Sequence, residues 1–68
     1  MTGKVVRMED GFVYVELYDG QQAWFEPLGD YDIEVDDEIS GNLSAVGPKE
    51  LVNKTKHYTM SVSGEGHT

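Results

Sequence analysis

The chain has 68 residues and a net charge of −8, from 13 acidic and 5 basic side chains. One domain of this length buries only about 60% of the surface that its unfolded chain exposes, so its core must be small. The absence of cysteine excludes disulfides and thiolate-bound metals, and no apolar run approaches the roughly 20 residues of a membrane span. Charges interrupt each short apolar pair at the N-terminus, so we expect no signal peptide, and a cytoplasmic protein.

The N-terminal half is predicted to form three strands joined by turns: Thr2–Glu9, Phe12–Tyr18 and Gln21–Glu26. The first strand needs one extra residue to keep Val5 and Met8 on the same side, which a β-bulge supplies. Asp19 and Gly20 form a dipeptide that is typical of tight hairpins, because both residues tolerate positive φ. The third strand ends at Pro27, which cannot donate to a ladder.

The C-terminal half is predicted to hold a loop and two strands: Leu28–Asp37 as the loop, then Glu38–Ala45 and Leu51–Ser63. Gly47 and Pro48 mark a turn between the two strands. The last strand is long enough to require a bend. We expect residues 1–63 to form the domain and residues 64–68 to be a frayed tail.

Five short strands with turns every 8–12 residues predict an all-β fold, a small antiparallel OB-like barrel, with an SH3-like barrel as the alternative. Closure of the sheet would also remove exposed edges. The residues expected to face inward are Val5, Met8, Val13, Val15, Leu17, Ala23, Phe25, Ile33, Val35, Ile39, Leu43, Tyr58, Met60 and Val62.

The spacing of Gly3 and Val5, of the segment 11–17 and of Ile33–Ile39 resembles the RNA-binding OB-fold modules of translation initiation factor one and of the largest small-subunit ribosomal protein. The similarity extends over residues 3 to about 45. It implies that Phe12 and Trp24, on the second and third strands, form a platform on which single-stranded RNA stacks. The chain lacks the basic rim of that family, and it has Asp36 where the family usually has glycine.

Strand alternation leads to the same aromatic residues. If Val13, Val15 and Leu17 face the core, then Phe12 and Tyr14 stand outside, beside Trp24 from the next strand, and exposed aromatics indicate a contact surface. Lys54 and Lys56 could contact phosphate, whereas Glu16 and Glu26 would repel it. The alternative is that these aromatics only pack across strands.

The segment from Glu26 to Glu38 contains seven acidic residues, both ends included, and no base. Their alternation is similar to that of a calcium-binding loop, but Val35 stands where the turn glycine is required and Gly41 where a bidentate glutamate is required. We therefore expect a solvated acidic loop that binds no metal. Attraction of a basic partner would explain its charge, and adaptation to high salt is an alternative explanation.

The residues favour a binding module over an enzyme. His57 and His67 have no metal-ligand spacing, and no nucleophile or phosphate-loop motif is present, so we expect no catalytic residue and no cofactor. The first hypothesis is weak binding of single-stranded RNA or DNA, through contacts at Phe12, Tyr14, Trp24, Lys54 and Lys56. The alternative is an acidic protein-interaction module: an adaptor, an assembly subunit or a self-associating barrel.

Overall fold

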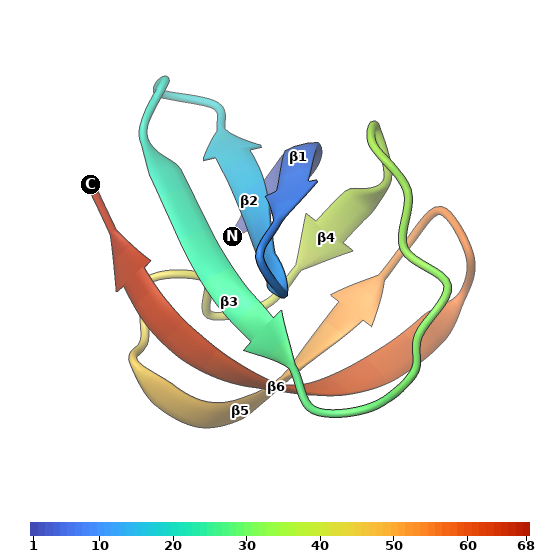
Figure 1. Cartoon of the computed structure of the whole chain (residues 1–68). Coiled ribbons are helices and arrows are strands. Elements are labelled where there is room, and N and C mark those ends of the chain that lie inside the picture. Colours follow the sequence, from blue (N-terminus) through green and yellow to red (C-terminus); the bar gives the residue numbers. More distant parts are fainter.

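Alternating apolar residues and short turns fold the chain into a closed antiparallel β-barrel, which a computed structural model describes for residues 1–68 (Figure 1). The strands are β1 (Thr2–Glu9), β2 (Phe12–Leu17), β3 (Gln22–Pro27), β4 (Glu38–Ser40), β5 (Gly47–Asn53) and β6 (Tyr58–His67). Their order around the barrel is β1-β2-β3-β6-β5-β4. The predicted small barrel is thus confirmed, with 6 strands where 5 were expected. The chain contains no helix with the length and hydrophobicity needed to cross a membrane.

Two three-stranded meanders, β1–β3 and β4–β6, build the barrel, and the pairs β3–β6 and β1–β4 close it. The predicted bulge in β1 is present, because the register with β2 shifts between Val5 and Arg7. Asp10 and Gly11 have φ values of 54° and 84°. They form the two central residues of a turn between Glu9 and Phe12, as in the tight hairpins whose twist matches that of the strands.

The core lies on the side of the alternation that was predicted. Its buried apolar residues are Val5, Val13, Val15, Ala23, Phe25, Ile39, Leu43, Leu51, Met60 and Val62, against which Leu17, Tyr31, Ile33 and Tyr58 pack in part. Two of the residues expected inside are not buried: Met8 is 47% exposed and Val35 is 51% exposed. Met8 pairs with Val13, but this pair lies next to the turn of the β1–β2 hairpin, at the end of the barrel, where no other strand covers the Met8 side chain. Near Val35, Asp37 takes the buried position instead.

The C-terminal half differs most from the prediction. The strand expected at 38–45 ends at Ser40, and the expected single strand 51–63 is a hairpin of β5 and β6, whose turn has His57 at a φ of 63°. Residues 64–68 were expected to fray, which is wrong, because β6 extends to His67. Gly64 and Gly66 pair with Phe25 and Trp24 of β3. The end of the chain is therefore one of the strands that close the barrel.

Candidate functional site

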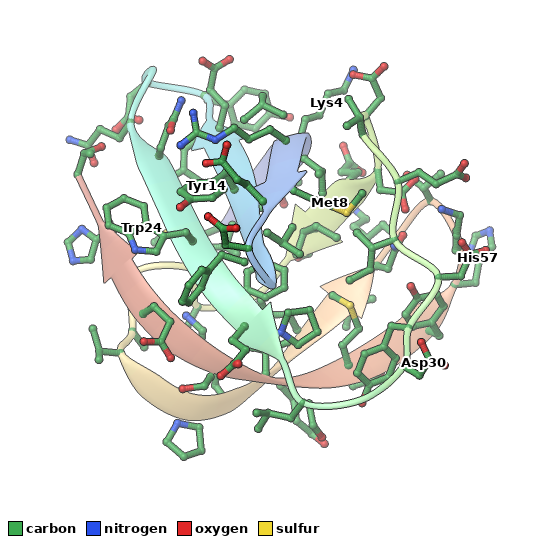
Figure 2. The ribbon with its side chains drawn as sticks, viewed as in Figure 1. Lys4, Met8, Tyr14, Trp24, Asp30 and His57 are labelled. Carbon is green, nitrogen blue, oxygen red and sulfur yellow. The ribbon has the colours of Figure 1, made fainter.

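A row of side chains crosses the outside of the barrel where β1, β2, β3 and β6 lie side by side. Arg7 pairs with Tyr14, Tyr14 pairs with Trp24, and Trp24 pairs with Gly66. The inward neighbours Val13, Val15, Ala23 and Phe25 are buried, so strand alternation turns Tyr14 and Trp24 outward. We call Arg7, Tyr14 and Trp24 the aromatic face; Figure 2 shows Tyr14 and Trp24 next to each other on neighbouring strands.

The three side chains of the aromatic face contact one another. The ring centroids of Tyr14 and Trp24 are 6.0 Å apart, with an angle of 32° between the rings, which is within the range of favourable aromatic pairs. The Arg7 guanidinium lies 4.1 Å from the centroid of the Tyr14 ring, a cation–π distance. Tyr14 and Trp24 are half-buried, so contacts within the barrel itself hold both rings in place.

Charges of both signs surround the aromatic face. Lys4 pairs with Glu16 across β1 and β2, while Glu26 follows Trp24 on the exposed side of β3. Phe12, half-buried, precedes Tyr14 on the same side of β2. The cations Lys4 and Arg7 are therefore balanced by carboxylates, and no continuous basic track crosses this part of the barrel.

Lys54 and Lys56, expected to assist the aromatics, lie elsewhere. They belong to the turn 54–57, which leads from β5 into the first residue of β6, whereas Trp24 pairs near the last residue of β6. Figure 2 shows Trp24 and His57, the neighbour of Lys56, on opposite sides of the barrel. The structure thus brings Tyr14 and Trp24 together with Arg7, and Phe12 beside them, but separates both lysines from this group.

Both lysines instead pair with the acidic segment. Lys54 Nζ lies 3.7 Å from Glu38, and Lys56 Nζ lies 2.7 Å from Asp37, 2.9 Å from Glu34 and 3.9 Å from Asp32. The ammonium group of Lys56 occupies the place between the carboxylates of the loop. The segment that looked uniformly acidic in sequence is therefore partly neutralised from another part of the chain.

Asp37 is the buried member of this network, 4% exposed. Its Oδ2 accepts hydrogen bonds from Asn53 Nδ2 at 2.9 Å and from the backbone N–H of Glu34 at 3.0 Å, besides that from Lys56. Burial raises the pKa of Asp37, but these hydrogen bonds outweigh burial and hold the pKa below its usual value. Burial lowers the pKa of Lys56, and its carboxylate partners raise it further than burial lowers it. The network fixes the loop to β5 and to the turn between β5 and β6.

Asn53 completes the network from inside the barrel. It is fully buried, and its Oδ1 accepts the backbone N–H of Lys56 at 2.9 Å. Sequence reasoning missed Asn53 and Asp37, although a signal was present. Asn53 lies two residues after Leu51 and Asp37 two residues before Ile39, so in an extended chain both point to the same side as these buried residues. A polar residue at an inward position of a strand indicates a buried polar network.

Comparisons of the chain with models of known protein families, with curated proteins and with solved structures found no match.

Proposed function

We propose that the barrel is a non-enzymatic, cytoplasmic binding module and that the aromatic face is its interface with another protein. The observation that carries this proposal is the ordered contact of Arg7, Tyr14 and Trp24 on the outside of the barrel. Tyrosine, tryptophan and arginine are the residue types that dominate the energy of protein interfaces. Rigid aromatic side chains bury a large area and lose little conformational entropy on binding.

The charges around the aromatic face favour a protein over a nucleic acid. Affinity for nucleic acids depends mainly on neutralisation of phosphates by lysine and arginine. Near Tyr14 and Trp24 only Lys4 and Arg7 could serve, and Glu16 and Glu26 lie beside them. A protein partner can pair its own charges with both signs, which gives the complementarity that a specific interface requires.

Weak binding of single-stranded RNA or DNA is the second candidate, favoured by the same aromatic pair. Stacking of a base on an aromatic side chain contributes about 1–3 kcal/mol, and Phe12 extends the row along β2. In this alternative Arg7 and Lys4 would contact phosphate in place of Lys54 and Lys56, since both of these lie in ion pairs. The resemblance to RNA-binding OB-fold modules supports it.

Site-specific photo-crosslinking in cells separates the two candidates. A benzophenone side chain replaces Tyr14 in one variant and Thr59, exposed on β6, in the control. We expect discrete protein adducts from position 14 that nuclease leaves intact and that position 59 does not give. Adducts that nuclease removes, together with a change of Trp24 fluorescence on titration with short RNA at low salt, would favour the second candidate. The absence of adducts specific to position 14 would contradict both.

A further inference from the structure

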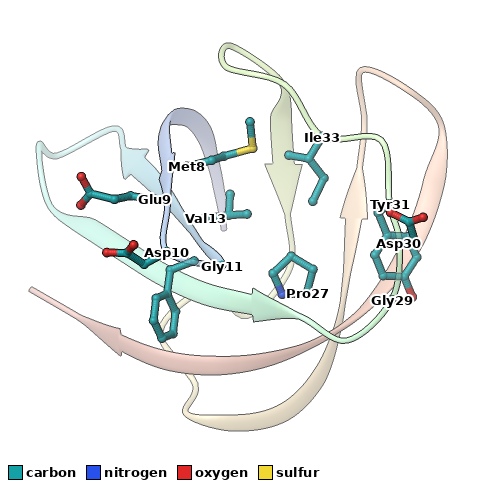
Figure 3. A pocket seen from close by; sticks show the side chains of 11 residues that line it. Met8, Glu9, Asp10, Gly11, Val13, Pro27, Gly29, Asp30, Tyr31 and Ile33 are labelled. Carbon is teal, nitrogen blue, oxygen red and sulfur yellow. The ribbon is translucent and has the colours of Figure 1, made fainter.

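A groove lies at one end of the barrel, between the β1–β2 hairpin and the loop that follows β3 (Figure 3). Its volume is about 320 Å³, which is in the range of small ligand sites. Residues 8–13 of the hairpin form one wall, and Pro27, residues 29–31 and Ile33 form the other. Only Phe12 stands both in this groove and beside the aromatic face.

The floor of the groove is apolar. In Figure 3 the side chains of Met8 and Ile33 point toward each other over Val13, with Pro27 beneath them. Met8 shares the inward side of the hairpin with Val13, its partner across the strands, yet 47% of Met8 is exposed because neither another strand nor the loop covers it. The barrel thus leaves open an apolar position that its own chain does not fill.

The rim of the groove is acidic. Glu9 and Asp10 stand on the hairpin side and Asp30 on the loop side, and no lysine, arginine or histidine lines the groove. Figure 3 shows the Glu9 and Asp10 side chains extending outward from the hairpin, on the side away from Asp30, so that the apolar floor lies between these carboxylates and Asp30. Carboxylates placed on two sides of the floor suit an extended ligand with several positive charges better than a single metal ion.

Both walls are held in place without a ligand. The backbone N–H of Leu28 donates to Ser61 O at 2.9 Å, and the Tyr31 hydroxyl accepts the N–H of Ser61, also at 2.9 Å. The Tyr31 ring stacks on Tyr58, with centroids 5.9 Å apart. On the other side, Asp10 and Gly11 form the tight turn of the hairpin. A site formed in advance binds without the entropy cost of ordering its own loops.

We infer that this groove is a second binding site, which takes a basic segment of a partner protein. The segment inserts one apolar side chain between Met8 and Ile33, and its lysine or arginine residues on either side pair with Glu9, Asp10 and Asp30. Charge complementarity identifies the partner, since an acidic rim attracts cationic peptide and repels phosphate. The site is separate from the aromatic face and does not depend on what binds there.

The test is binding of a synthetic peptide with a central leucine flanked by two arginines on each side, followed by amide chemical shifts of the ¹⁵N-labelled protein. A peptide with serine in place of leucine is the control. We expect shifts at residues 8–13 and 29–33, and affinity for the serine peptide about tenfold lower, which corresponds to about 1.4 kcal/mol. Shifts centred on Tyr14 and Trp24, equal affinity for both peptides, or no binding at millimolar peptide would each overturn the inference.

Variants localise the effect. Met8→Ser should weaken leucine-peptide binding several-fold, and Asp10→Asn or Asp30→Asn should each weaken it roughly twofold to fivefold, as expected for exposed charge pairs. Val52→Ser and Glu50→Gln, exposed on β5, are the matched controls and should bind as the unmodified protein does.

Trp24→Ala should also leave peptide binding unchanged. A result that contradicts the proposed role of the aromatic face can therefore be told apart from one that contradicts binding in the groove. Without peptide, the spectra of the unmodified protein could show line broadening that grows with protein concentration. If Met8→Ser abolished this broadening, a second copy of the chain would be the occupant of the groove, and the basic peptide would be overturned as its occupant.

Discussion

The Trp24 indole lies over Gly66, its partner on β6, so closely that a Cβ atom at Gly66 would be 2.7 Å from the ring carbon Cζ2. Glycine within a strand usually weakens the strand, because it has no side chain to pack. Here the indole covers the exposed backbone of Gly66, a device by which aromatic residues stabilise glycine in sheets. Gly66 is thus the residue that sets the position of Trp24 on the aromatic face.

Gly66→Ala should therefore displace the indole while the barrel remains folded. Contacts below 3.0 Å are not tolerated, so Trp24 must rotate away from β6 and become more exposed. We expect a red shift of the tryptophan emission and a loss of stability of about 1–3 kcal/mol, as for other overpacked sites. Partner crosslinking at position 14 should fall, while peptide binding in the groove is unchanged. Glu65→Ala, at the exposed neighbouring residue, is the control, and an unchanged emission spectrum in Gly66→Ala would contradict the role of Gly66.

Val15→Asp should unfold the domain. Val15 is fully buried and pairs with Val5 and Ala23 on both sides, so an aspartate there would be a buried charge without a partner. Domains have only about 5–15 kcal/mol of stability in total, and one this small lies near the lower end. Circular dichroism should show no cooperative melting. Val52→Asp, at a position 40% exposed on β5, should melt cooperatively; a cooperative Val15→Asp would mean that the faces of β2 are reversed.

Alternation and turn chemistry were sufficient to predict the N-terminal meander. Val13, Val15, Ala23 and Phe25 are buried as expected. This half was predictable because the alternation of apolar residues and the turn residues are both signals between near neighbours in the sequence. The C-terminal half was less predictable, since the turn between β5 and β6 has no glycine or proline and is formed through Asn53, which accepts the N–H groups of Lys56 and His57. Side-chain turns of this kind are a weaker signal in sequence.

The candidate site could be predicted only in part, because its polar contacts connect distant residues. Strand alternation identified Tyr14 and Trp24. It could not reveal that Arg7 stacks on Tyr14, since that contact depends on the position of the bulge in β1. Nor could composition show that Lys56 lies among the carboxylates of a loop 19 residues earlier. Charge counted along the chain therefore misplaced Lys54 and Lys56 and overstated the net charge of the acidic segment.

The Asp37–Lys56 pair predicts a specific loss of stability in acid. A carboxyl whose pKa is lower in the folded than in the unfolded chain stabilises the fold above its unfolded value, here 3.8, and this contribution is lost as the pH falls through the lower folded pKa. Asp37→Asn should lower Tm by roughly 5 °C or more at neutral pH. The Tm difference between the two proteins should stay constant from neutral pH to about 5 and shrink below about 4. The other carboxylates titrate in both proteins, so their effect on Tm cancels in the difference. A Tm difference that does not change with pH would therefore show that the titration of Asp37 contributes no stability.

The acidic segment should respond to salt unevenly along its length. Asp32, Glu34 and Asp37 pair with Lys56, and Glu38 pairs with Lys54, but Asp30 and Asp36 have no ion pair. At low ionic strength the unpaired charges repel the rest of a protein with a net charge of −8, and salt screens this repulsion within a Debye length of about 10 Å at 0.1 M. Tm should therefore rise from low to moderate sodium chloride.

Asp36→Asn tests this account most directly. Asp36 has a φ of 78°, which asparagine adopts as readily as aspartate, so the substitution removes charge without adding backbone strain. We expect Tm to rise by roughly 2–4 °C at low salt and the salt effect to shrink. Asp32→Asn, which removes the same charge but also an ion pair with Lys56, should change Tm less. Equal gains from both substitutions would mean that Lys56 does not offset the charge of Asp32, and a fall of Tm in Asp36→Asn would mean that repulsion in this segment does not limit stability.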